Sequence, residues 1–116
     1  MMNKILWFSR HDMSQEQKQA LIDKLGEIEI NKVDKTINSA YEVKGEIDAA
    51  DIVAIVAPIN LQQQFLKLAG DKPVIMAVSE RILVPQEDGT ETKVVFKFVK
   101  WEQLDEITVK KHDFAM

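Results

Sequence analysis

The segment DIVAIVAPINLQQQFLKLAG, residues 51–70, contains one complete strand–helix unit. Its first part, Asp51 to Ala57, is an unbroken run rich in β-branched residues, which predicts a strand covered on both faces. Pro58 ends this strand because proline has no N–H to donate to a ladder. A helix with an apolar stripe follows; Asn60 and Gln63 have the spacing of a helix cap, and Gly70 suits the stop. A buried strand leading directly into a helix favours an α/β fold with a parallel sheet.

The N-terminal part repeats this pattern. Lys4 to Phe8 is a continuous apolar run and predicts a second buried strand. Ser14 and Gln17 have capping-box spacing ahead of an apolar stripe, and Gly26 suits the end of that helix. Glu27 to Ile30 alternates between polar and apolar residues, which predicts a short strand. The chain therefore opens as strand, helix, strand.

The C-terminal third begins with another apolar strand, Pro73 to Val78. Arg81 to Pro85 and Lys93 to Trp101 then flank a polar stretch in which Asp88 and Gly89 form a turn signal. Because residues 93–101 alternate with a period of two, the pair predicts a β-hairpin.

The segment from Asn31 to Ala50 is the least regular. Val33, Ile37 and Tyr41 recur every four residues, which favours a helix there. Together the elements predict an α/β protein with three layers, a mostly parallel sheet with helices on its faces and a C-terminal β-hairpin. We expect one domain over residues 1–116.

Composition limits the possible functions. The chain has 116 residues, of which 46% are hydrophobic, enough to form a core without the support of disulfide bonds or a structural metal. It has no cysteine, so a cytoplasmic location is expected. The four apolar residues ahead of Ser9 are too few for a signal peptide or a membrane span. A net charge of −4 disfavours long nucleic acid as a partner and leaves a small anion in a local basic pocket as the alternative.

Three polar segments follow the three most apolar strands and form the candidate ligand site: Ser9-Arg10-His11, Pro58-Ile59-Asn60-Leu61 and Ser79-Glu80-Arg81. Ligands of open parallel sheets bind beyond the carboxyl ends of the strands, where helix N-termini converge. If the three strands are neighbours, the segments share one edge. Arginine forks and helix N-termini suit phosphate, so the sequence predicts a site for a phosphate-bearing ligand there.

Each of these residues also has a purely structural interpretation. Arg10 and His11 can solvate the end of a strand, and Asn60 can be only a helix cap. Arg81 can pair with Glu80 or with a cross-strand acid such as Glu91, and Ser79 can simply end a strand. The sequence contains no P-loop, no glycine-rich dinucleotide motif and no histidine cluster with metal-ligand spacing, so no cofactor and no metal are expected.

Three segments of the chain, ILWFSRHDMSQEQ, ADIVAIVAPINLQQQFLKLAG and DKPVIMAVSERILVPQEDGTETKVVFKFVKW, resemble the small single-domain CRISPR-associated ring nucleases, or a phage or mobile-element relative of them. The resemblance covers nearly the whole chain apart from Asn31 to Ala50 and the tail. It implies a Rossmann-like fold of the CARF type. Where that family often has Thr-Lys-Arg, this chain has Ser79-Glu80-Arg81, and the acid weakens the case for anion binding at that place.

The resemblance implies that a homodimer binds cyclic oligoadenylate and cleaves it without a metal ion. In such a reaction the 2′-hydroxyl attacks its own phosphate, so the protein supplies geometry and charge stabilisation. Arg10 and the N–H groups after Pro58 would stabilise the phosphoryl oxygens, Ser9 and Asn60 would orient the ribose, and His11 would protonate the leaving oxygen or hydrogen-bond the ring. Two alternatives remain: a non-catalytic nucleotide sensor or sponge of the same fold, and a partner-binding module that uses Phe98, Trp101 and the hairpin edge.

Overall fold

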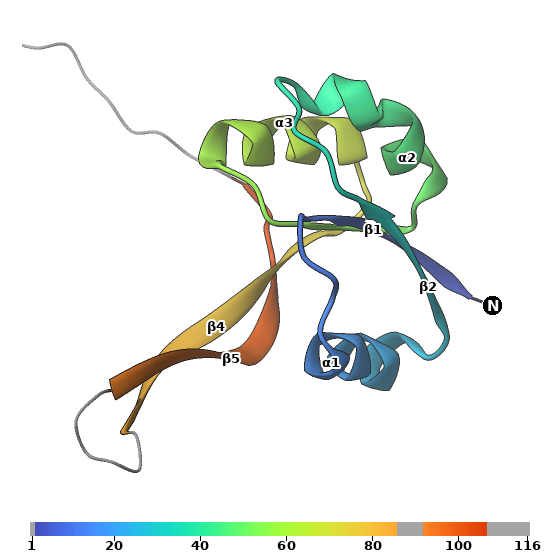
Figure 1. Ribbon diagram of the computed structural model, residues 1–116. Helices are drawn as coiled ribbons and strands as arrows, with labels where there is room; N and C mark the ends of the chain where they lie inside the picture. The colour runs from blue at the N-terminus through green and yellow to red at the C-terminus, as the bar shows by residue number, and fades with distance from the viewer. Residues whose placement is uncertain (1, 86–91, 107–116) are drawn as a thin grey trace, which may run out of the picture.

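The computed structural model describes residues 2–85 and 92–106 and has an α/β architecture (Figure 1). Its elements, in chain order, are β1 (Asn3–Phe8), α1 (Gln15–Leu25), β2 (Ile28–Val33), the 3-10 helix η1 (Ala40–Val43), α2 (Lys44–Ala49), β3 (Ile52–Ile55), α3 (Ile59–Ala69), β4 (Val74–Pro85) and β5 (Thr92–Gln103). The sheet has five strands in the order β2-β1-β3-β4-β5. The first four are parallel, and β5 is antiparallel to β4.

The mostly parallel sheet and the antiparallel β4–β5 pair confirm two sequence-based predictions. The predicted Asp88-Gly89 turn lies outside the described residues. None of the described helices has the length and apolarity needed to cross a membrane.

Helices cover both faces of the sheet, and each face has its own core. Along β1, Leu6 and Phe8 point toward α2 and α3, where they pack with Phe65, and Ile5 and Trp7 point toward α1. All four β1 side chains are buried, as a strand between two helical layers requires. Figure 1 shows α1 on one side of the sheet and α2 and α3 on the other.

The ends of α1 follow the sequence signals. The Ser14 hydroxyl accepts a hydrogen bond from the Gln17 N–H, and the Gln17 side chain accepts one from the Ser14 N–H, so the predicted capping box is present. Gly26 ends the helix with φ +84°, a conformation that L side chains rarely adopt.

The predicted Asn60 cap of α3 is wrong. Pro58, in an extended conformation, occupies the N-cap position, and no side chain caps this helix. The Pro58 carbonyl accepts the N–H groups of Leu61 and Gln62, so the helix starts before Asn60 can cap it. Asn60 is instead an exposed residue of the first turn.

The predicted helix through Val33, Ile37 and Tyr41 is also wrong. Val33 ends β2, which runs past the predicted strand end at Ile30 and pairs with β1 along its whole length. Ile37 is buried in the connection, and Tyr41 is 56% exposed. The helical turn starts later, at the cap Ser39, because Glu42 completes a capping box with it.

The strand predicted at Pro73–Val78 extends to Pro85. Strand β4 pairs with β3 only at Val74 and Ile75, and from there it continues with β5 as a two-stranded ribbon that projects from the sheet (Figure 1). A register irregularity interrupts the β4–β5 pairing between Val78 and Ser79. We call residues 76–85 and 92–102 the ribbon.

Candidate ligand-binding site

A cleft of about 400 Å³ lies at the carboxyl ends of β1, β2 and β3. We call it the Arg10 cleft. Ser9, Arg10 and His11 line it from the end of β1, and Pro58 and Leu61 line it from the start of α3. Two of the three predicted polar segments therefore meet at one edge of the sheet.

The loop after β1 is held in place by three hydrogen bonds. The Ser9 hydroxyl, on a residue that is only 6% exposed, accepts the His11 N–H at 3.1 Å. The indole N–H of Trp7 donates to the His11 carbonyl at 2.7 Å, and the Ser9 N–H donates to the Val33 carbonyl at 3.3 Å. The His11 backbone is therefore anchored through both its N–H and its carbonyl. These bonds fix the position of the backbone from which the exposed imidazole extends at the cleft.

The Arg10 cleft is basic. Its lining includes the exposed side chains of Arg10 and Lys35 and no carboxylate. The Arg10 guanidinium donates to the Thr36 hydroxyl at 2.9 Å, which leaves most of its N–H donors for a ligand. Neither cation forms an ion pair with another residue of the described ranges.

The start of α3 adds hydrogen-bond donors to the same edge. Pro58 makes no side-chain cap bond, and among the described residues the N–H groups of Ile59 and Asn60 have no partner. The first N–H groups of a helix lie at the positive end of its dipole, which attracts anions. This helix end and the two cations together suit a phosphate.

Sequence reasoning missed Lys35 and Thr36. It ended β2 three residues too early, at Ile30, so the polar residues after Val33 were assigned to a helix rather than to the edge where the parallel strands end. Extending the strand to Val33 would have placed Lys35 beside the site.

The third predicted segment does not join the Arg10 cleft. Ser79, Glu80 and Arg81 lie inside the long strand β4, so the prediction that they follow a strand is wrong. In the ribbon Ser79 is opposite Phe98 and Arg81 is opposite Phe96. Glu80 and Arg81 form no ion pair with each other, and Glu91 lies outside the described residues.

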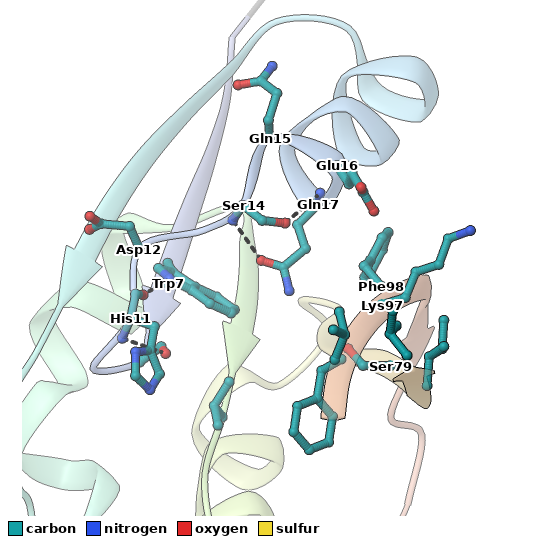
Figure 2. A pocket seen from close by; sticks show the side chains of 16 residues that line it. Trp7, His11, Asp12, Ser14, Gln15, Glu16, Gln17, Ser79, Lys97 and Phe98 are labelled. Atoms are coloured by element: carbon teal, nitrogen blue, oxygen red, sulfur yellow. Dashed lines mark hydrogen bonds between the residues drawn. The ribbon is translucent and has the colours of Figure 1, made fainter. Parts of the chain in front are cut away.

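A second and larger cleft, of about 640 Å³, lies between the start of α1 and the ribbon (Figure 2). We call it the ribbon cleft. Ser9, His11 and Val56 line both clefts, so the two clefts are neighbours at the end of β1. Ser79 lines the ribbon cleft from its far wall, whereas Arg81 lines neither cleft.

Asp12, which also lines the ribbon cleft, is neutralised by a neighbour. Its carboxylate accepts a hydrogen bond from the Lys32 ammonium at 2.8 Å, and this bond lowers the pKa of Asp12 and raises that of Lys32. Within residues 2–85 and 92–106, no three His, Cys, Asp or Glu side chains gather in an arrangement suited to a metal ion.

Comparison with known proteins gives no relative: no protein-family model matches the chain, and searches of curated proteins and of solved structures return no match. The class of protein therefore rests on the fold and the clefts. It is an α/β protein with a mixed five-stranded sheet and a basic cleft where the parallel strands end.

Proposed function

We propose that the protein binds a phosphate-bearing nucleotide in the Arg10 cleft, with cyclic oligoadenylate as the ligand. The observation that supports this most is the pair of cations that line one cleft, Arg10 and Lys35, with no carboxylate among the lining residues. The unpaired N–H groups of Ile59 and Asn60 lie at the same edge of the sheet, next to the lining residue Pro58. A charged donor to phosphate makes a stronger hydrogen bond than a neutral one.

The strand order supports a Rossmann-like fold of the CARF type. In the order β2-β1-β3-β4, the chain leaves β1 in one direction and later returns to its other side at β3. The Arg10 cleft lies at this reversal, which is where doubly wound sheets bind their ligands.

We further propose that bound cyclic oligoadenylate is cleaved without a metal ion. The 2′-hydroxyl gives its proton to water and its oxygen attacks the adjacent phosphorus, so that a 2′,3′-cyclic phosphate forms and the bond to the 5′ oxygen breaks. Arg10 stabilises the charge on the phosphoryl oxygens, and His11 gives a proton to the leaving oxygen. Ser9, which lines the Arg10 cleft, orients the ribose. Asn60, which the sequence also suggested for this role, is exposed at the start of α3 and does not line the cleft, so it has no part in this step.

A homodimer is part of this proposal, because a ligand with two-fold symmetry favours a two-fold site. The ribbon offers apolar surface for it: Val94 and Val99 are 38% and 46% exposed. The partner-binding alternative requires Trp101 to contact another protein. In this structure Trp101 packs against Trp7 and donates to the Gln17 carbonyl of its own chain. Light scattering after size-exclusion chromatography tests the dimer; a monomer at high concentration would contradict it.

The decisive experiment is incubation of the purified protein with cyclic tetra-adenylate and cyclic hexa-adenylate in the presence of a chelator, followed by chromatography of the products. Linear products from wild type and intact rings with the Arg10→Ala variant support cleavage. Calorimetric binding without turnover would instead favour the sensor or sponge. A flat titration with both rings would overturn nucleotide binding altogether.

A further inference from the structure

The ribbon cleft adjoins the Arg10 cleft but differs from it in chemistry. Ser9, His11 and Val56 line both clefts, so a ligand held at Arg10 that reaches past His11 would enter the ribbon cleft. The charges of the ribbon cleft are mixed: Lys97 and Glu16 both line it, and Asp12 is paired with Lys32. This space therefore does not favour a second phosphate and suits an uncharged part of the ligand.

Three aromatic side chains, Trp7, Phe96 and Phe98, line this space. Phe96 is 72% exposed, an unusual state for a phenyl ring because its apolar area remains in water. Phe98 lines the cleft beside it and packs on Trp101 with 5.8 Å between ring centroids. Trp101 in turn contacts the edge of Trp7, also at 5.8 Å, and Trp7 lines the cleft from β1. A flat apolar group entering here would cover the exposed ring of Phe96.

Polar groups lie at the rim of the same space. The Gln17 side-chain oxygen accepts the Ser14 N–H at 2.9 Å, which leaves its amide N–H donors for a ligand. Figure 2 shows this side chain between Trp7 on one wall and Phe98 and Lys97 on the other. Ser79 contributes a hydroxyl from the ribbon, and Glu16 contributes carboxylate acceptors.

We propose that the ribbon cleft is the nucleobase subsite of the ligand whose phosphate lies in the Arg10 cleft. A heteroaromatic base has two apolar faces and an edge of donors and acceptors, and this cleft offers an exposed aromatic ring together with polar groups at the rim. Stacking of a base on an aromatic side chain is favourable for any base. The inference rests on the proposed nucleotide binding and adds where the base lies and that Phe96 stacks on it.

The test compares two probes that share a phosphate and differ in the base. Adenosine 5′-monophosphate carries both groups, whereas ribose 5-phosphate lacks the base. Isothermal titration calorimetry is run on wild type, Phe96→Ala, Phe96→Leu and the control Leu83→Ala. Leu83 is also an exposed apolar residue of the ribbon, but it does not line the cleft. Because Phe96 and Leu83 are both exposed, all variants are expected to fold, and circular dichroism checks this.

Wild type is expected to bind adenosine monophosphate more tightly than ribose 5-phosphate. Phe96→Ala should weaken the binding of adenosine monophosphate about tenfold, which corresponds to about 1.4 kcal/mol, and leave ribose 5-phosphate unchanged. Phe96→Leu should lose part of this affinity, and Leu83→Ala none.

Equal affinity of wild type for both probes, or no effect of Phe96→Ala, would overturn the base subsite while phosphate binding at Arg10 stands. If neither probe binds wild type, the proposed nucleotide binding fails as well, and the base subsite with it.

Discussion

Replacement of Trp101 by phenylalanine tests the contact that fixes the ribbon against α1. The indole N–H of Trp101 donates to the Gln17 carbonyl, with 3.1 Å between nitrogen and oxygen, and its ring meets Trp7 at an interplanar angle of 87°. Both contacts join Trp101 to residues that are far from it in the sequence, Gln17 in α1 and Trp7 in β1. Without this contact the far wall of the ribbon cleft would lose its position.

The size of the effect follows from the two contacts. Loss of a partly buried hydrogen bond costs about 1 kcal/mol. Weaker edge-to-face packing of the smaller ring on Trp7 costs about 1 kcal/mol more. For a domain of this length a total of about 2 kcal/mol lowers the melting temperature by about 8 °C.

Urea unfolding followed by circular dichroism measures this difference directly. The control is Phe96→Leu, an exposed position on the same strand, which should stay within about 0.5 kcal/mol of wild type. A Trp101→Phe variant with the stability of wild type would refute the packing of the ribbon on α1, and with it the shape of the ribbon cleft.

Three further changes test the site and the helix ends. Arg10→Ala should weaken the binding of ribose 5-phosphate about tenfold by calorimetry, because a charge-assisted hydrogen bond contributes about 1.5 kcal/mol. The free energy of unfolding of this variant should stay within about 0.5 kcal/mol of wild type. A clear loss of stability would instead give Arg10 a structural role. Ser14→Ala should destabilise the protein by about 1 kcal/mol through loss of the α1 cap, whereas Asn60→Ala in uncapped α3 should change urea unfolding by less than about 0.5 kcal/mol. Two backbone N–H groups donate to the Glu42 carboxylate and lower its pKa from the ordinary 4.5. The folded protein thus binds this proton less readily than the unfolded chain, and the contribution of Glu42 to stability is full above pH 4.5 and is lost as the pH falls through the lowered pKa. Unfolding measured against pH should show this acid-side loss in wild type and less of it in Glu42→Gln; identical profiles would contradict the assignment.

The fold was predictable where burial leaves a simple pattern. Residues 4–8 and 51–57 contain continuous apolar runs because the central parallel strands are covered on both faces, and the cap at Ser14 and the glycine at position 26 each have a local mechanism. Strand β2 was harder to recognise because it is an edge strand whose residues Glu29, Asn31 and Lys32 are exposed, so its apolar signal stops early.

The candidate site was predictable only in part for the same reason. The segments after β1 and β3 meet because both strands are central neighbours. The segment Ser79-Glu80-Arg81 looks like a loop because it is polar, but a ribbon that projects from the sheet is solvated and accepts polar residues within a strand. No local pattern distinguishes the two cases, since the difference depends on β3 being only four residues long.

The short pairing between β3 and β4 makes the ribbon an adjustable part of the molecule. Only Val74 and Ile75 tie β4 to its parallel neighbour, and the packing of the two central cores does not involve the outer half of either ribbon strand. Adding or removing one residue in each ribbon strand, as a matched pair, would therefore change the length of the ribbon. The two cores that stabilise the rest of the sheet and the helices would keep their packing. For the ligand proposed above, the length of the ribbon would then set the size of the group that the ribbon cleft accepts.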